Sequence, residues 1–240
     1  MSLQYKKFLL FGDSITEFSF NSGMVEDVES FSFGSALTNV YTRKMDIMQR
    51  GFSGYNSRWA LKILPKILET EANSNIAMGF IFFGANDSCL GGHQRVPLEE
   101  FVENITKLVQ MMKSSGIKTI LIGPGLYDKE KWESIKPDDI AEGRVRSQEE
   151  FKKYSDAGEA IAKAENVPFV NLNKAFREQG GDKWQDLMMD GIHFSGKGSL
   201  IFYNELLKTI RENYPEYAPE NIEYKLPNWS DVKPDGSNIN

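Results

Sequence analysis

The chain has 240 residues, 40% hydrophobic and 26% charged, so a single globular domain can bury a core without disulfides or metal. Its net charge is −6 and its basic residues are interspersed with acidic ones, which argues against nucleic acid as a partner. The single cysteine, the lack of a secretory pattern in residues 1–7 and the lack of an apolar run near ~20 residues lead us to expect a cytoplasmic protein without a membrane span.

Strand and helix patterns alternate along the chain. Short, mostly apolar runs predict buried parallel strands at residues 7–12, 45–50, 76–83, 119–123 and 168–172. Helical periodicity predicts helices at residues 34–43, 58–71, 148–165 and 197–213, and a further helix from Leu98 that ends at Gly116. This alternation favours an α/β fold: a three-layer sandwich with a five-stranded parallel sheet of the flavodoxin-like, doubly wound kind.

Two polar segments fall outside this pattern. Residues 128–147 are rich in charge and too long for an ordinary connection, so we expect a rim or lid beside the functional site rather than part of the core. Residues 1–214 form the predicted domain. The tail, 215–240, carries several aromatic residues, and we expect it to dock on that domain or on a second subunit, which makes a homodimer possible.

Polar residues follow the predicted strands at the edge where open α/β sheets bind ligands. They are Ser14 after the first strand, Gly54 and Asn56 after the second, Asn86 and Asp87 after the third, and Asp190 with His193 beyond the fifth. Separate loops thus bring a serine, a glycine turn, an amide and an Asp-His pair to one edge.

This set of residue types suits nucleophilic catalysis. A serine hydroxyl needs a base to attack a carbonyl, and His193 can serve Ser14 while Asp190 accepts the other ring N–H. The other histidine, His93, lies in a polar stretch with no carboxylate shortly before it, so we expect His193 to be the base. The backbone N–H groups of Ser14 and Gly54 and the amide of Asn86 are candidates for an oxyanion hole.

Four short motifs carry a resemblance to a known family. They are GDSI at 12–15, GFSG at 51–54, GAND at 84–87 and DGIH at 190–193. They resemble the four ordered blocks of the GDSL/SGNH hydrolase family, matched at Ser14, Gly54, Asn86 and His193. Residues 49–61 and 193–198 are further similar to the fungal branch that hydrolyses isoamyl acetate. The resemblance implies a flavodoxin-like fold, a Ser-His-Asp triad, hydrolysis of short- to medium-chain esters, and a homodimer.

Each candidate also has a structural explanation. Ser14 can cap the turn after the first strand, Gly54 can be a turn glycine, and Asn86 with Asp87 can form a turn. We expect Asp13 to brace its loop rather than to react.

The sequence therefore predicts a serine carboxylester hydrolase that acts on a small-molecule ester through an acyl-enzyme. No cofactor is expected, and no cluster of histidine, cysteine and carboxylate has the spacing of a metal site. An acyl thioesterase or lysophospholipase is an alternative, with a longer acyl groove built from Phe18, Phe20, Met24, Phe31 and Phe33. A second alternative is a module that binds a small ligand at the same edge of the sheet and catalyses no reaction.

Overall fold

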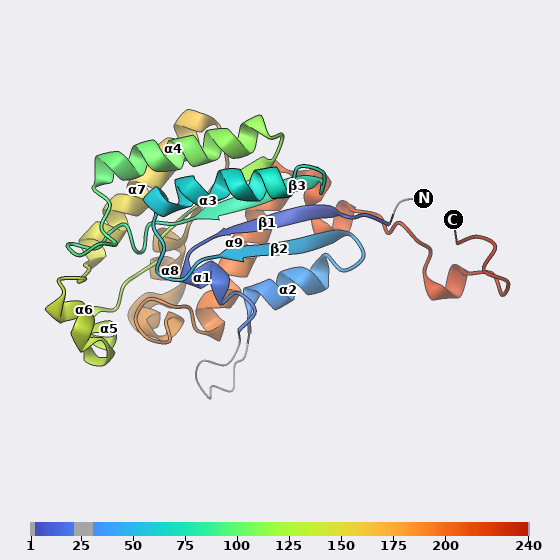
Figure 1. Ribbon diagram of the computed structural model, residues 1–240. Coiled ribbons are helices and arrows are strands. Elements are labelled where there is room, and N and C mark those ends of the chain that lie inside the picture. The colour runs from blue at the N-terminus through green and yellow to red at the C-terminus, as the bar shows by residue number, and fades with distance from the viewer. Residues whose placement is uncertain (1–2, 22–30, 240) are drawn as a thin grey trace.

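Five parallel strands form one sheet in the order β2-β1-β3-β4-β5 (Figure 1). The computed structural model describes residues 3–21 and 31–239. Its strands are β1 Lys6–Gly12, β2 Met45–Gly51, β3 Ile76–Phe82, β4 Lys118–Gly123 and β5 Phe169–Asn171, each boundary within one residue of the prediction. The strand order is the flavodoxin-like one, so the predicted fold class is confirmed.

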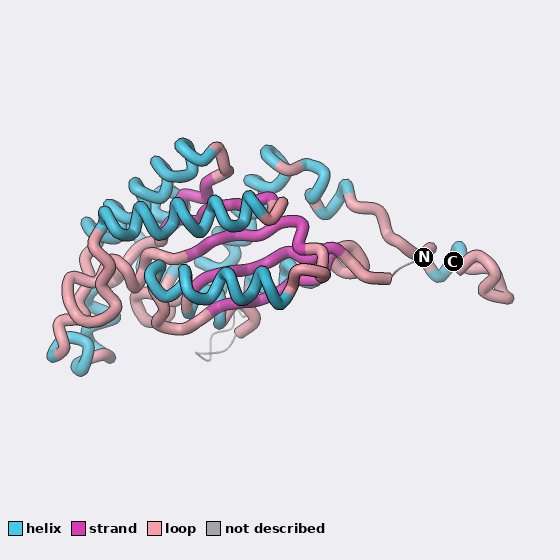
Figure 2. The backbone as a smooth tube through the Cα atoms, turned by 45° about the horizontal axis from the view of Figure 1, so that its top comes forward, coloured by secondary structure: helices cyan, strands magenta, loops and turns pink. Residues whose placement is uncertain are grey.

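Helices cover both faces of this sheet, which lies between them in the tube view (Figure 2). On one face are α3 Ser57–Thr70, α4 Leu98–Ser114 and α7 Gln148–Glu165; on the other are α2 Phe33–Val40, α8 Leu172–Gly180 and α9 Gly196–Asn213. The three-layer sandwich is therefore confirmed. Within the described ranges, no helix is both long enough and apolar enough to cross a membrane.

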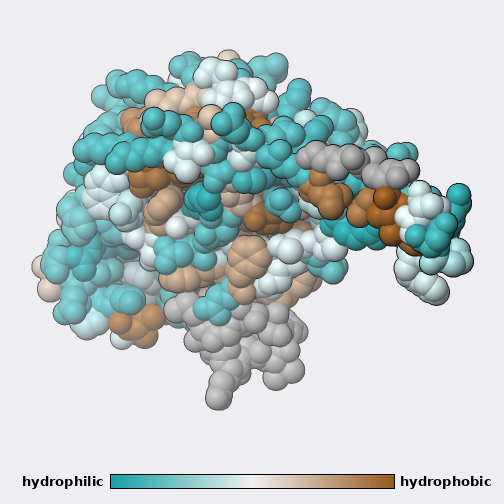
Figure 3. Space-filling model, turned by 45° about the vertical axis from the view of Figure 1, so that its right-hand side comes forward, coloured by the Kyte–Doolittle hydropathy of each residue, from teal (hydrophilic) through white to brown (hydrophobic). Residues whose placement is uncertain are grey.

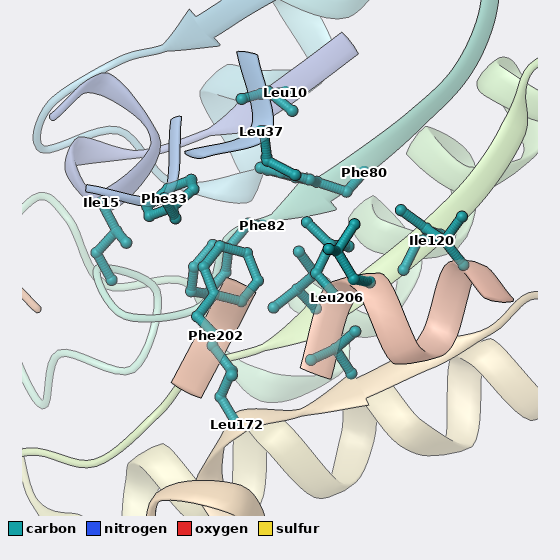
Figure 4. Packing of buried hydrophobic residues seen from close by; sticks show 14 of the residues in the cluster. Leu10, Ile15, Phe33, Leu37, Phe80, Phe82, Ile120, Leu172, Phe202 and Leu206 are labelled. Atoms are coloured by element: carbon teal, nitrogen blue, oxygen red, sulfur yellow. The ribbon is translucent and has the colours of Figure 1, made fainter. Parts of the chain in front are cut away.

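Alternation along the strands divides the core into two clusters. Phe8 and Leu10 of β1 point into the cluster under α2, α8 and α9, whereas Leu9 points into the cluster under α3, α4 and α7. Figure 4 shows Phe202 of α9 beside Phe82 of β3, and their ring centroids are 5.6 Å apart. Full burial of such a ring stabilises the fold by about 1.5–3 kcal/mol.

The strand order reverses between β1 and β3, which places a crevice at their carboxyl ends. The register pairs Gly12 with Gly51 of β2 on one side and with Phe82 of β3 on the other. The loops after these three strands therefore leave the sheet at the same level, where they can contribute side chains to one site.

Among the helices that cover the sheet, α2 and α8 differ from the predictions. α2 ends at Val40 rather than at residue 43, and Arg43 adopts a positive φ of 63°, which a continuing helix cannot contain. α8 has no counterpart among the predicted elements. It begins directly after β5 because the side chain of Asn171 accepts a hydrogen bond from the N–H of Lys174 (2.9 Å) and caps the helix. A 3-10 helix, η1 Gly181–Leu187, follows α8.

The polar segment 128–147 folds into two short helices, α5 Lys129–Ile135 and α6 Pro137–Ala141, at one end of the molecule (Figure 1). The expectation that no part of it belongs to the core is wrong for one residue, Trp132. Trp132 and Arg146 are buried, and Trp132 belongs to a small apolar cluster with Tyr127 and Phe151. Composition averaged over the segment hides these two side chains among its many exposed charges.

The C-terminal tail first lies against the domain and then extends away from it (Figures 1 and 3). Its first part contains the 3-10 turns η2 Pro215–Tyr217 and η3 Pro219–Asn221, and the carbonyl of Tyr217 accepts a hydrogen bond from the hydroxyl of Tyr41 (2.8 Å). The later part, 223–239, includes the turn η4 Trp229–Asp231 and is called the C-terminal arm below. Trp229 is 90% exposed on this arm.

Candidate active site

Ser14 lies at the sharp turn between β1 and the short helix α1 (Ser14–Glu17). The side chain of Asp13 caps α1 by accepting a hydrogen bond from the N–H of Ile15 (3.0 Å), as its expected bracing role requires. The turn is possible only with a glycine before it, because a Cβ on Gly12 would lie 2.6 Å from the carbonyl oxygen of Phe82. Ser14 is thereby presented at the carboxyl edge of the sheet.

Asp190 and His193 lie on a tight loop closed by an antiparallel bridge between Met188 and Phe194. Oδ1 of Asp190 accepts hydrogen bonds from the N–H groups of Ile192 (3.0 Å) and His193 (2.9 Å). These two bonds fix the carboxylate so that its other oxygen, Oδ2, faces the imidazole ring.

Gly191, between them, has a φ of 102°. The start of α5 occupies the position that a side chain at residue 191 would take. A Cβ there would lie 2.5 Å from the carbonyl oxygen of Asp128 and 2.8 Å from the amide nitrogen of Trp132. The N–H of Asp128 also donates a hydrogen bond to the carbonyl of Gly191 (2.9 Å). The segment 128–147 therefore packs directly against the Asp-His loop.

The hydroxyl of Ser14, the ring of His193 and the carboxylate of Asp190 form one hydrogen-bonded chain. Nε2 of His193 lies 2.8 Å from Oγ of Ser14, and Nδ1 lies 2.6 Å from Oδ2 of Asp190. A carboxylate is an acceptor, so Nδ1 carries the proton and Nε2 is free to accept from the serine. The rings of Phe18 and Trp132 flank the imidazole at centroid distances of 5.7 and 6.0 Å.

Electrostatics favour the ionised form of Asp190. Burial alone would raise its pKa, but the hydrogen bond and charge of His193, with the two backbone N–H donors, hold the pKa below its usual value. The carboxylate therefore stays charged at neutral pH and stabilises an imidazolium on His193.

The three predicted oxyanion donors surround the same site. In the described part of the chain, neither the N–H of Ser14 nor that of Gly54 donates a hydrogen bond, and Gly54 has the positive φ (76°) of a tight turn. The side-chain nitrogen of Asn86 donates one hydrogen bond, to the carbonyl of Tyr55 (2.9 Å), which leaves its second N–H unused. All three can donate to an oxyanion at no loss of internal hydrogen bonds.

Asn56 and Asp87 support the loops rather than enter the cavity. The carboxylate of Asp87 accepts from the N–H of Ser57 (2.9 Å), and Asn56 caps α3 by accepting from the N–H of Trp59 (3.1 Å). Burial raises the pKa of Asp87 to about 6. Burial likewise raises the pKa of the Cys89 thiol, which suppresses its thiolate and argues against a role as nucleophile.

These residues line a cavity of about 480 Å³, within the range of small-molecule sites. It is lined by Ser14, Phe18, Ser53, Gly54, Asn86, His93, Gln94, Trp132, Lys136, Asp139, Arg144, Arg146, Asp190, Ile192 and His193. Of the five apolar residues considered for an acyl groove, Phe18 lines it. Phe31 and Phe33 pack on the core, Phe20 is not among the lining residues, and Met24 lies outside the described residues.

The sequence patterns do not point to several of these lining residues, namely His93, Gln94, Trp132 and Arg146. The ring of His93 stacks on the ring of Trp59, with centroids 5.9 Å apart. A lone histidine beside glycines has no motif that would reveal this position. Among the described residues, no group of three or more His, Cys, Asp or Glu could hold a metal ion.

Comparison with known proteins matches residues 8–222 to the family model of GDSL-like lipase/acylhydrolases. The chain is 59% identical over 238 residues to an isoamyl acetate-hydrolyzing esterase of Saccharomyces cerevisiae, with 99% of each chain covered. It is 33% identical to a human isoamyl acetate-hydrolyzing esterase 1 homolog, covering 96% of this chain and 90% of the relative.

Solved structures share the fold at lower sequence identity. A lipase/acylhydrolase from Enterococcus faecalis superposes with a TM-score of 0.66 at 23% identity, covering 92% of this chain and 100% of the other. An acetyl xylan esterase superposes with a TM-score of 0.65 at 17% identity, covering 85% and 99%.

Proposed function

Because the chain belongs to the GDSL-like lipase/acylhydrolase family and is a carboxylic ester hydrolase, we propose that Ser14 is its nucleophile, His193 its general base and Asp190 the carboxylate that orients the base. The observation that carries this assignment is the hydrogen-bonded chain from the serine hydroxyl through the imidazole to the carboxylate, with both contacts below 3 Å. Two loops distant in sequence contribute to it, one carrying Ser14 and the other carrying both Asp190 and His193.

The reaction follows from this geometry. Ser14 attacks the ester carbonyl while Nε2 of His193 takes its proton, and Asp190 stabilises the imidazolium. The N–H groups of Ser14 and Gly54 and the amide of Asn86 bind the oxyanion that forms. The tetrahedral intermediate collapses, His193 protonates the departing alcohol, and the acyl group stays on Ser14. Water then attacks the acyl-enzyme with His193 again as base, which releases the acid and restores the serine.

Replacement of the nucleophile tests this assignment. Ser14→Ala is expected to lower kcat/KM for p-nitrophenyl acetate by at least ~10⁴-fold, because the alanine methyl group cannot attack the ester carbonyl. Covalent labelling by an organophosphate, followed by peptide mass spectrometry, should place the adduct on Ser14. Near-normal turnover in Ser14→Ala would reject the nucleophile, and an unlabelled Ser14 would favour a site that only binds a ligand.

The proposed substrates are short- to medium-chain esters such as isoamyl acetate. Similarity to the yeast enzyme supports this proposal, as does the wall of the cavity. Its apolar members are Phe18, Trp132 and Ile192, and most other lining residues are polar or charged, so a long acyl chain finds little apolar surface. Activity that rises from acetate to decanoate esters, or with acyl-CoA, would instead favour the thioesterase or lysophospholipase alternative.

The proposed assembly is a cytoplasmic homodimer in which the C-terminal arm contacts a second subunit. The arm supports this proposal because, after Tyr224, Leu226 and Pro227 contact Arg43, it leaves the domain and carries an almost fully exposed tryptophan, Trp229. A chain that ends at Ile222 keeps the part of the tail that packs on the core. We expect it to sediment as a monomer and the full chain as a dimer; equal masses would reject the role of the arm. Cell fractionation tests the location.

A further inference from the structure

The amide group of Asn86 is held in one orientation by its surroundings. Its oxygen accepts hydrogen bonds from Nη2 of Arg146 (3.1 Å) and from Nε2 of Gln94 (3.3 Å), and its nitrogen donates to the carbonyl of Tyr55 (2.9 Å). A flipped amide would place its NH₂ group against two donors and its oxygen against a carbonyl. The surroundings therefore keep the second N–H of Asn86 available to the cavity.

Arg146 is an unusual residue to find in this place. Its side chain is buried, with a relative exposure of 3%, and within the described residues no carboxylate lies within 4 Å of it. Its remaining hydrogen bonds go to neutral oxygens, including the carbonyl of Ala85 (2.9 Å) and, at 3.4 Å, the carbonyl of Arg144. Burial of a cation without an ion-pair partner is unfavourable. Its two shortest hydrogen bonds go to Asn86 and to the residue before it, which points to a role at this site.

We propose that Arg146 is a positioning residue that orients and polarises Asn86 as an oxyanion donor. A guanidinium on the amide oxygen draws electron density from the amide nitrogen and makes its N–H a stronger donor, an effect that grows in a buried environment. Its bond to the carbonyl of Ala85 holds the preceding residue as well, so the guanidinium ties the loop and the side chain together. This inference rests on the proposed function, in which Asn86 binds the oxyanion.

The same arrangement gives a role to segment 128–147. The guanidinium of Arg146 lies over the ring of Trp132 (5.5 Å to the centroid). The ring of Trp132 also contacts the ring of His193. The start of α5 packs against Gly191 of the Asp-His loop. One segment thus holds the base through Trp132 and Asp128 and the oxyanion donor through Arg146.

A double-mutant cycle tests the proposal. Asn86→Ala alone should lower kcat about 10²- to 10³-fold, the usual loss for one oxyanion donor. Arg146→Met in the natural background should lower kcat about 10- to 100-fold with KM within about threefold, because orientation matters most in the transition state. In the Asn86→Ala background, the same change should alter kcat by less than about threefold.

Two outcomes would overturn it: an equal loss from Arg146→Met in both backgrounds, or a raised KM with unchanged kcat, which would mean that Arg146 binds substrate directly. All rates are divided by the concentration of active sites, measured by titration of the reactive serine with an organophosphate. Misfolded protein therefore does not lower the apparent kcat. Arg146→Lys repeats the cycle with the buried charge retained, which protects the fold, and the same pattern is expected. Arg211→Met removes a forked contact with Glu220 far from the cavity and should leave kcat unchanged.

Failure of this inference and failure of the proposed function are distinguishable. If Ser14→Ala retains activity, the proposed function is wrong. If activity depends on Ser14 but the losses from Arg146→Met and Asn86→Ala multiply, the function stands and the positioning role of Arg146 is wrong.

Discussion

Asp13 should make the stability of this protein depend on pH in the direction opposite to most carboxylates. Its side chain is buried; Oδ1 accepts the cap hydrogen bond from Ile15, while Oδ2 has no hydrogen-bond partner among the described residues. Burial raises its pKa to about 7, although the Ile15 hydrogen bond and the charges of His193 and Arg146 act the other way. Asp13→Asn is the informative change, because it keeps a capping oxygen and removes the titration.

The direction and size of this pH dependence of stability follow from the folded-state and unfolded-state pKa values of Asp13. With a pKa of about 7 in the folded state and 3.8 as its ordinary value, the folded protein binds the proton more tightly. Stability from this group is therefore complete below about pH 4 and is lost as the pH rises through 7, with a slope of at most ~1.4 kcal/mol per pH unit. Between pH 8 and pH 5 the wild type should gain on the order of 2–3 kcal/mol relative to Asp13→Asn.

Urea unfolding of both proteins at pH 5, 6, 7 and 8 measures this difference. Asp87, whose pKa is raised to about 6 by burial, titrates in both proteins, and its charge also raises the pKa of Asp13, so the comparison reports Asp13 together with this coupling. The contribution of Asp190 to stability should depend on pH in the opposite direction, because the folded state lowers its pKa. That contribution is present above the unfolded-state pKa of Asp190 and is lost as the pH falls through its folded-state pKa. A constant difference between wild type and Asp13→Asn across this range, or a gain toward pH 8, would refute the reasoning.

Three further changes follow from the contacts described above. In Asp190→Asn, the amide oxygen keeps the two backbone donors and the amide nitrogen faces Nδ1 of His193. An amide N–H beside Nδ1 holds the ring proton on Nε2, so His193 cannot accept the proton of Ser14. The kcat for p-nitrophenyl acetate should fall about 10³- to 10⁴-fold, and an unchanged kcat would contradict this. Gly191→Ala places a Cβ 2.5 Å from the carbonyl oxygen of Asp128, at a backbone φ of 102°. Scanning calorimetry should show that the free energy of unfolding falls by about 2 kcal/mol or more, and kcat should fall as well. A Tm equal to that of the wild type would contradict this. Phe202→Ala removes a fully buried ring between the sheet and α9 and should cost about 3–5 kcal/mol in urea unfolding, whereas a loss below ~1 kcal/mol would mean that the core collapses around it.

The fold and the residues proposed to react were predictable from the sequence because their signals are local. Apolar runs and helical periods lie within single elements, so strand boundaries agree to within one residue. Ser14, Asn86 and His193 each lie in a short motif, and the carboxyl edge of a parallel sheet is a general meeting place for loops. The distance of 2.8 Å between Ser14 and His193 agrees with that expectation.

What only the tertiary structure decided is the set of residues that surrounds this centre. Arg146 and Trp132 are buried within a segment whose average composition is that of an exposed loop, and Gln94 meets Asn86 through a hydrogen bond that no spacing rule predicts. Arg146 and Trp132 reach this centre through contacts between loops that are far apart in sequence, whereas Gln94 meets Asn86 through the conformation of the loop that carries both. Such contacts depend on the relative placement of whole elements, and no short stretch of residues encodes that placement.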